Sequence, residues 1–352
     1  MKILAVNPGS TSTKLAVYEN ENLLFEQTIR HPDADIMKLP ELEDQLPYRL
    51  ESIMEALREQ DFNPSELAAV VGRGGMLKPM DSGTYLVDDS MLNDARIGKY
   101  GNHASNLGSM ISAEIAGSHH IPAFIVDPVC VDELVPEARV SGLADIERKS
   151  HVHALNIKGV SRKIAAHLGK DLEDASFVVA HLGGGISVAA VRNGQIIDVN
   201  NAENEGPFSP ERAGGLPAKQ LVQLCFSGKY NEKELLQRMT KQGGVYSYLR
   251  TKNLIEVESR AAEGDSEAGL ILKALVHQIG KEIGAMATVL EGKMDGIILT
   301  GGIAHSDRVV GLIKKKISFL GKVFILSGEA EMEALAAGAL RVMRGLEDAK
   351  IY

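Results

Sequence analysis

The sequence predicts an α/β protein that is divided into two related domains. The chain has 352 residues, which exceeds the length at which a single hydrophobic core keeps growing. Short apolar runs typical of strands alternate with helical patterns along the chain. A strand, a turn of small residues and a second strand open both halves, at 4–17 and again at 179–189. This weak internal repeat favours two domains of similar construction.

Each half contains both strands and helices. In the first half we expect strands at 3–6, 14–18, 69–71, 84–87 and 123–126, and helices at 50–58 and 107–115. In the second half we expect helices at 155–168, 308–316 and 332–343, and strands at 177–180, 186–191, 196–199, 296–300 and 323–326. Several further helices are expected between 200 and 290.

The composition excludes several classes of protein. Hydrophobic residues make up 44% and charged residues 24% of the chain, which is ordinary for a globular protein. The net charge of −9 argues against a general nucleic-acid binder. The two cysteines, Cys130 and Cys225, lie far apart in apolar stretches. We expect them to be core residues in a reducing compartment, and we expect no disulfide or zinc site.

No segment is typical of a signal peptide or a membrane span. The apolar run at 3–6 is too short for the core of a signal peptide. The segment 268–290 is interrupted by Lys273, His277, Lys281 and Glu282, whereas a span needs about 20 mostly apolar residues. We therefore expect a soluble, cytoplasmic protein that does not bind a membrane.

The first turn has the residues of an anion-binding loop. Gly9 permits close approach of the backbone, and Ser10 and Ser12 belong to a run of small hydroxyl residues. Successive backbone N–H groups in such a turn form a concave site for anions, and Lys14 would add a positive charge. The spacing differs from a Walker loop, and a strand follows where that loop has a helix.

Two later glycine segments have related features. Gly183, Gly184 and Gly185 form the turn of the second hairpin, and Gly301 and Gly302 follow the strand expected at 296–300. Glycines allow a ribose or a flat base to lie against the backbone, and a following helix N-terminus favours anions. Each segment alone is also compatible with an ordinary turn. Together the three turns favour a phosphate-containing ligand.

These segments resemble the acetate and butyrate kinase family. The signature segments of the family are matched at 7–14, 181–185 and 300–303, and further segments resemble its butyrate kinase branch at 70–75, 127–129, 150–156, 209–217 and 331–335. The resemblance implies two ribonuclease-H-like domains, as in actin and the sugar kinases, with the active site in the cleft between them. We expect an N-terminal domain of 1–149 and 333–352, and a nucleotide-binding domain of 150–332.

The resemblance implies a reversible transfer of the γ-phosphoryl group of ATP to a short-chain fatty acid, with Mg²⁺ as cofactor. A carboxylate is ionised at pH 7 and needs no general base, but its repulsion from the triphosphate must be overcome. Guanidinium groups suit that task because they stay charged and bind bidentately. Arg212 matches a family arginine well, whereas Arg73 is displaced from the corresponding pattern.

Other residues gain roles from the resemblance. His153 matches the histidine that contacts the transferring phosphoryl group, although His151 competes with it. Asp127 follows the strand at 123–126, a position suited to a metal contact, and an N-cap is its ordinary explanation. Glu333 matches the family's magnesium-associated glutamate; Glu331 is the alternative, and a first-turn carboxylate is the ordinary explanation of both. The expected nucleotide-binding residues are Asn7 (also near the metal), Ser10, Ser12, Lys14, His181, Gly183, Gly184, Gly185, Gly301, Gly302 and Ile303.

The expected substrate is a four- or five-carbon acid. Acetate enzymes of the family have phenylalanine directly before the catalytic histidine, and the residue here is the smaller Val152. Each further buried methylene contributes roughly 0.8 kcal/mol, so a butyrate or branched-chain acid is favoured over acetate or propionate. The alternatives are a sugar or other hydroxyl kinase with Asp127 as base, and a non-enzymatic, nucleotide-switched binding protein. A homo-oligomer is expected, and 276–289 is a candidate apolar interface.

Overall fold

The computed structural model describes all 352 residues, which form two compact units. The first unit comprises Met1–Val131 and Ala330–Tyr352, and the second comprises Asp132–Glu329. Residues 132–149, which we expected with the first domain, lie in the second unit. There Val135 N–H donates to Ile197 O at 3.0 Å, and the Arg148 guanidinium pairs with Asp198 and Glu205, each at 3.1 Å. These contacts join residues far apart in the chain, so no local sequence pattern predicts them.

The sheet of the first unit has six strands in the order β3-β2-β1-β4-β6-β5. β1, β2 and β3 form an antiparallel meander, β4 and β6 continue the sheet parallel to β1, and β5 is antiparallel to β6. The strands are β1 (Lys2–Pro8), β2 (Ser12–Glu19), β3 (Asn22–Arg30), β4 (Leu67–Arg73), β5 (Thr84–Leu86) and β6 (Ala123–Val126).

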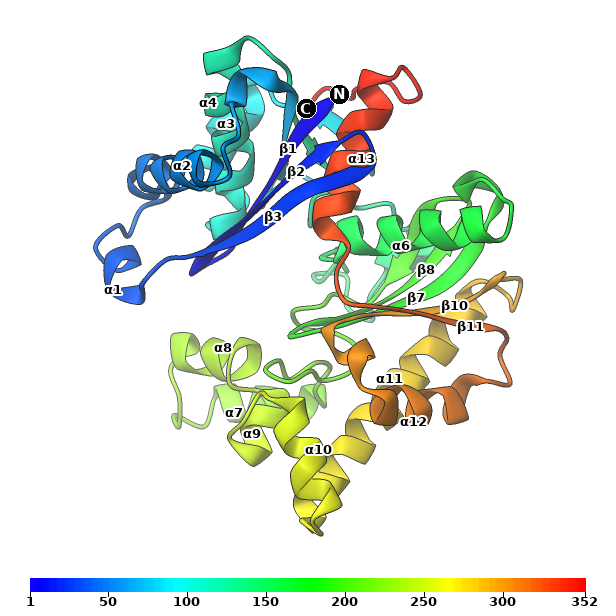
Figure 1. The fold of residues 1–352 in the computed structure, drawn as a ribbon. Helices are drawn as coiled ribbons and strands as arrows, with labels where there is room; N and C mark the ends of the chain where they lie inside the picture. Colours follow the sequence, from blue (N-terminus) through cyan, green and yellow to red (C-terminus); the bar gives the residue numbers. More distant parts are fainter. The chain divides into compact units, whose positions relative to one another are not determined.

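Helices cover both faces of this sheet (Figure 1). Leu4 and Val6 of β1 point into the core under α2 (Leu42–Glu59) and α4 (Leu107–His119). The alternate side chains of β1 face α13 (Glu331–Met343), which also packs on β4 and β6. The remaining helices are α1 (Asp33–Ile36), α3 (Asp89–Arg96), and the short 3₁₀ turns η1 (Pro64–Glu66) and η2 (Ala104–Asn106).

The sheet of the second unit has five strands in the order β11-β10-β7-β8-β9. β7, β8 and β9 form an antiparallel meander, and β10 and β11 continue the sheet parallel to β7. The strands are β7 (Ser176–Leu182), β8 (Ile186–Arg192), β9 (Gln195–Val199), β10 (Gly296–Gly301) and β11 (Val323–Ser327). This strand order repeats that of β3-β2-β1-β4-β6, so the internal repeat in the sequence corresponds to a repeat in topology.

In the second unit, α6 packs on one face of the sheet, and α11 and α12 pack on the other (Figure 1). Four more helices lie between β9 and α11 in sequence, and α10 packs against α11. The helices are α5 (Pro136–Arg139), α6 (Ala154–His167), α7 (Ala218–Cys225), α8 (Glu232–Thr240), α9 (Gly244–Leu249), α10 (Leu254–Ala262), α11 (Ser266–Val289) and α12 (Asp307–Ile317), with 3₁₀ turns η3 (Leu172–Asp174) and η4 (Gly302–His305).

Four expectations need correction. The edge strand β3 was not predicted, because Leu23 and Leu24 are exposed and the strand lacks a buried alternating face. α2 begins eight residues before the expected position of 50, with Pro47 inside it, a residue that usually ends a helix. The apolar side chains of 276–289 are buried in the core of the second unit, so they do not form an exposed interface. Cys225 is exposed.

None of the helices is long and apolar enough to cross a membrane. The two cysteines are free, and no cluster of three or more histidine, cysteine, aspartate or glutamate side chains that could hold a metal ion is present.

A buried ion pair links Lys158 of α6 to Glu133, which is hydrogen-bonded to β9, and provides a stability test. Lys158 Nζ lies 2.7 Å from Glu133 Oε2, with side chains 1% and 4% exposed, and Glu133 also accepts the Ile196 N–H. Lys158→Met should lower the free energy of unfolding by about 3–5 kcal/mol, because it removes one partner of a buried ion pair. Urea unfolding measures the change.

The matched control for Lys158→Met is Lys38→Met. Lys38 also has an acidic partner, Asp35 at 2.9 Å, but its side chain is 72% exposed. This substitution should change the free energy of unfolding by at most about 1 kcal/mol. Equal effects of the two substitutions would contradict the structural role of the buried pair.

Candidate active site

Two glycine segments of the second unit lie side by side because β7 pairs with β10. His181 is the register partner of Thr300, so the chain turns at Gly183–Gly185 and Gly301–Gly302 next to each other. Gly301 has φ +89°, and a Cβ there would lie 2.4 Å from Leu182 O, which only glycine avoids. Two of the three predicted glycine turns are thus brought together, whereas Gly9 belongs to the other unit.

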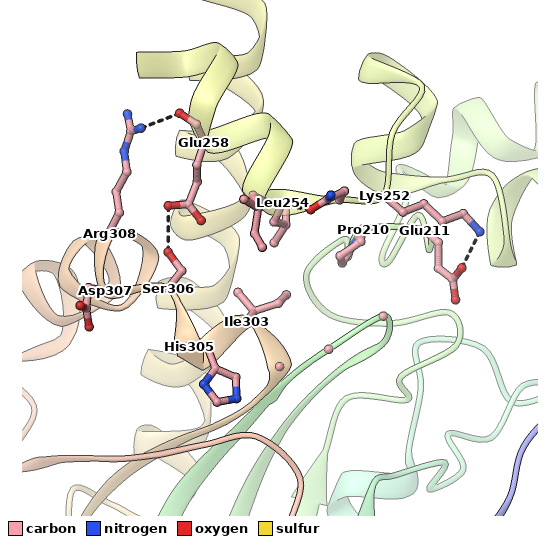
Figure 2. Close-up of a pocket in the computed structure, with 15 residues that line it drawn as sticks. Pro210, Glu211, Lys252, Leu254, Glu258, Ile303, His305, Ser306, Asp307 and Arg308 are labelled. Atoms are coloured by element: carbon pink, nitrogen blue, oxygen red, sulfur yellow. Dashed lines mark hydrogen bonds and ion pairs between the residues drawn. The ribbon is translucent and has the colours of Figure 1, made fainter. Parts of the chain in front are cut away.

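These glycines line a cavity of about 700 Å³. Its size is typical of small-molecule sites. The cavity lies between the glycine turns and the N-terminal ends of α10 and α12, as Figure 2 shows from the labelled side chains. The lining residues are Gly183, Gly184, Pro210, Glu211, Lys252, Asn253, Leu254, Ile255, Glu258, Gly302, Ile303, His305, Ser306, Asp307 and Arg308.

Hydrogen bonds and an ion pair hold the cavity wall. Glu258 connects α10 to α12, since its carboxylate accepts from Ser306 Oγ at 2.9 Å and its backbone oxygen accepts from Arg308 at 2.8 Å (Figure 2). Lys252 pairs with Glu211 at 2.6 Å. Leu254 and Ile303 add apolar surface. The wall therefore offers both apolar contact and polar groups in fixed positions.

Arg212 is anchored to the same glycine loop. Its Nη1 donates to Ala202 O at 2.9 Å, and its backbone N–H donates to Ser209 Oγ at 3.0 Å. The buried Ser209 hydroxyl in turn donates to Gly184 O. A Cβ on Gly185 would lie 2.6 Å from Arg212 Nη1. The guanidinium is therefore packed directly on Gly185.

Two histidines stack beside this loop. The rings of His153 and His181 have centroids 4.0 Å apart and planes at 12°. His153 Nδ1 lies 2.9 Å from Ser187 Oγ, and His153 Cε1 lies 3.4 Å from the position of a Cβ on Gly185. His153, His181, Arg212 and Gly185 thus form one group of neighbouring residues.

His151 takes a different environment. Burial lowers the pKa of its imidazole; Glu203 raises that pKa and Arg212 lowers it. Its backbone oxygen accepts from Ala202 N–H at 3.1 Å. His151 therefore lies near Arg212 without joining the stacked pair. Val152, between the two histidines, is 1% exposed.

A second group of predicted residues meets in the first unit. Asn7 Nδ2 donates to Glu331 Oε2 at 2.6 Å, and Arg73 Nη1 lies 3.1 Å from the same oxygen and 3.4 Å from Asn7 Oδ1. Asn7 lies on β1, Arg73 ends β4 and Glu331 begins α13. Packing of α13 on β1 and β4 brings these distant segments together.

Glu331, and not the expected Glu333, contacts Asn7 and Arg73. Glu331 is buried and bonded to Asn7 and Arg73, whereas Glu333 is exposed and contributes to the raised pKa of Tyr18, for which burial is the main cause. The helix geometry explains the difference, because residues two apart point to different sides of a helix. Sequence alone gave two acids in one helical turn and no means of choosing between them.

Asp127 follows β6 in a left-handed conformation, with φ +40°. Its carboxylate Oδ1 accepts the Gly83 N–H at 2.7 Å, and its own N–H donates to Gly83 O at 3.1 Å. The side chain is buried. Asp127 is thus held by the segment before β5, and it is not an N-cap.

A buried arginine holds the first glycine turn through hydrogen bonds. Arg49, on α2, donates to Ser10 O at 3.1 Å, to Ser12 O at 3.0 Å and to Thr13 Oγ1 at 3.0 Å. Burial, followed by the charge of Arg49, lowers the pKa of the neighbouring His31 to about 4. Arg49 therefore places a positive charge next to the turn that we expected to bind an anion. No sequence pattern indicated this role of Arg49.

Lys14 does not extend freely from that turn, because its ammonium pairs with Glu26 at 2.8 Å across β2 and β3. Sequence reasoning also missed Ser209, Glu258 and Arg308. Polar residues of these types are common on helices and loops, so only their contacts distinguish them. The glycines and the arginine beside them were the residues that a local pattern could reveal.

A model of the acetokinase family matches residues 144–334, which is more than half of the chain and includes every member of the second unit's site. The chain belongs to the acetokinase family. The matched range contains the stacked histidines, both glycine turns, Arg212 and Glu331.

Solved structures agree with this assignment at the level of the fold. Acetate kinase from Porphyromonas gingivalis matches with a TM-score of 0.80 at 18% identity, over 98% of this chain and 100% of that one. Acetate kinase from Entamoeba histolytica gives 0.76 at 16% identity, over 96% and 98%. A propionate kinase from Francisella tularensis subsp. tularensis SCHU S4 gives 0.73 at 20% identity, over 96% and 98%. The predicted fold class of this family, the actin-like α/β fold, is confirmed.

Gly301 and Gly302 provide a paired test of the site's construction. Gly301→Ala should lower the free energy of unfolding by roughly 2 kcal/mol or more, because of the positive φ and the close Leu182 O. Gly302→Ala places its Cβ in open space and should cost less than about 1 kcal/mol. Urea unfolding compares the two variants. A Gly302→Ala cost that equals or exceeds that of Gly301→Ala would contradict this geometry.

Proposed function

We propose that this protein transfers the γ-phosphoryl group of ATP to the carboxylate of a short-chain fatty acid and catalyses the reverse reaction. The observation that carries the proposal is the group formed by Arg212, His153 and His181 on the loop Gly183–Gly185. That loop also borders the 700 Å³ cavity. A ligand site and a cationic group therefore share one loop in a chain of the acetokinase family.

The cavity suits the nucleoside part of ATP. Leu254 and Ile303 give apolar surface for a base, and the glycine turns give backbone N–H groups with no side chains in the way. The N-terminal ends of α10 and α12, at Asn253 and Ser306, favour negative charge nearby. The phosphates would then follow the glycine loop towards Arg212.

The reaction requires that the negative charge of the phosphoryl group be compensated and that the carboxylate be positioned next to it. An oxygen of the ionised carboxylate forms a bond to the γ-phosphorus, the bond from phosphorus to the bridging oxygen breaks, and ADP leaves with that electron pair. No proton needs to be removed from the nucleophile. Arg212 would stabilise the charge on the transferring group. The histidines would donate hydrogen bonds to phosphoryl oxygens.

The proposed metal-associated groups belong to the first unit. Mg²⁺ prefers oxygen ligands and keeps several waters, so one or two protein carboxylates suffice. Glu331 and Asn7 present such oxygens, and Arg73 is bonded to both. Asp127 offers a further buried carboxylate. When bound, the ion supplies positive charge to the phosphates, and these residues would hold it and its waters.

We propose a four- or five-carbon acid as the preferred substrate. Val152 directly precedes His153, and its small side chain leaves more room there than an aromatic one would. One methylene in an apolar pocket discriminates only about 10- to 200-fold, so several acids should react. The acetate and propionate kinase structures to which the chain is similar make those two acids the alternative substrates.

An acid panel tests both the reaction and its specificity. The purified chain is incubated with ATP, Mg²⁺, hydroxylamine and acetate, propionate, butyrate, isobutyrate or isovalerate. We expect a hydroxamate to form, with kcat/KM for the four- and five-carbon acids at least roughly tenfold above that for acetate.

The outcomes of this assay separate the hypotheses. A preference for acetate would refute the Val152 argument and leave the phosphotransferase intact. If hydroxamate does not form but a hydroxyl compound such as a sugar is phosphorylated, the carboxylate acceptor is wrong.

Gly185→Ala tests the role of Arg212. The added Cβ would meet the end of the Arg212 side chain, which must shift while the backbone stays in place. A displacement of this kind should lower kcat about 100-fold, with a change in unfolding free energy below about 1 kcal/mol.

The control is Gly269→Ala on α11, where nothing lies within 4 Å of the added Cβ. It should keep the activity and stabilise the helix by about 0.5–1 kcal/mol. An active Gly185→Ala enzyme with wild-type kcat would show that the position of Arg212 does not matter.

A further inference from the structure

Asn156 is a fully buried amide that joins three elements of the second unit. It lies on α6, and its Nδ2 lies 2.8 Å from His181 Nδ1 on β7 and 3.2 Å from Thr300 Oγ1 on β10. It has no part in the roles described above. Its contact with His181, next to the glycine loop, raises the question of what it does to that imidazole.

The hydrogen-bond directions follow from the hydroxyl of Thr300. That hydroxyl has one proton and donates it to Gly328 O at 3.2 Å, so it must accept from Asn156. The group of Asn156 that faces Thr300 is therefore the NH₂ group. The same NH₂ group faces His181 Nδ1, which must then be the acceptor. A ring nitrogen that accepts carries no proton, so the proton of neutral His181 is on Nε2.

The Nε2–H group points to the side of the ring where the glycine loop lies. A Cβ on Gly183 would be 3.1 Å from His181 Nε2. Glu329 Oε1 lies 3.7 Å from Nε2. Gly183 borders the cavity. Nε2 therefore faces the part of the glycine loop that borders the cavity.

Stacking with His153 strengthens the same conclusion. Two imidazolium rings with centroids 4.0 Å apart would repel each other, so the pair can carry at most one extra proton at low cost. Asn156 uses the Nδ1 lone pair of His181 and thereby keeps this ring neutral. Arg212 also lies on the loop, at Gly185, so the loop already carries a positive charge.

We infer that Asn156 is a positioning residue that holds His181 as the neutral Nε2–H tautomer and aims this donor at the glycine loop. The tautomer itself depends only on contacts within the second unit. The consequence for phosphoryl transfer rests on the proposed function, because it needs the nucleotide phosphates at the loop.

Nuclear magnetic resonance of the full chain reads the tautomer directly. Long-range ¹H–¹⁵N spectra of protein labelled with ¹⁵N-histidine distinguish protonated from unprotonated ring nitrogens. The chain has ten histidines, so His181→Gln identifies the signal by its loss. We expect Nδ1 of His181 to be unprotonated and Nε2 to be protonated at pH 7.5. A protonated Nδ1 of His181 in the wild-type chain would overturn the inference.

Asn156→Asp then reverses the hydrogen bond. A carboxylate can only accept, so we expect the proton to appear on Nδ1 of His181. The matched control is Asn200→Asp, because Asn200 is an equally buried amide of this unit that bonds Val188 and Ile186 and not His181. It should leave the His181 signals in place. An unchanged His181 tautomer in Asn156→Asp would count against the inference.

Measurements of kcat and KM test whether the tautomer of His181 matters for the reaction. Asn156→Asp should lower kcat roughly 10- to 100-fold, as loss of supporting hydrogen bonds does at other sites, and should leave KM for the acid within about threefold. Asn156→Ser, whose hydroxyl can still donate to Nδ1, should recover part of kcat. Wild-type kcat in a chain with the reversed tautomer would refute the functional part alone. Absence of any kinase activity in the wild type would refute the proposed function and leave the spectroscopic result standing.

Discussion

Parallel pairing of β7 with β10 is the constraint on which the second unit's site depends. It sets His181 beside Thr300, so the turn after β7 and the bend after β10 leave the sheet together. This arrangement brings Gly301 so close to Leu182 O that only a residue without a Cβ fits there. The cavity, the stacked histidines and the anchoring of Ser209 to Gly184 all depend on this one register.

Positive charge is concentrated locally in a chain whose net charge is −9. Arg212 packs on the glycine loop of the second unit, Arg73 joins Asn7 and Glu331 in the first, and the buried Arg49 holds the first turn through neutral acceptors. The overall charge is therefore a poor guide to the ligand. What matters for an anionic ligand is which guanidinium groups are fixed next to backbone N–H groups, and in both units the arginines lie at glycine-containing turns.

Buried hydrogen bonds within the second unit support the glycine loop at 183–185. Ser209 and Asn156 are buried polar residues, and each connects a loop or helix to the strand ends at β7 and β10. Buried groups of this kind are costly unless satisfied. Here the Ser209 hydroxyl holds the backbone at Arg212, and the Asn156 amide holds the ring of His181.

The class of fold, most strands and helices, and the glycine turns could be predicted from the sequence, because these depend on local periodicity and on residues with special backbone freedom. It also singled out Arg212 and His153 through the resemblance to the family. The folded chain was needed to show that Glu331 contacts Asn7, to place residues 132–149 in the second unit, and to reveal Arg49, Ser209 and Asn156. These features depend on contacts between segments far apart in the chain. Two carboxylates in one helical turn look alike in the sequence, although only one of them faces the sheet.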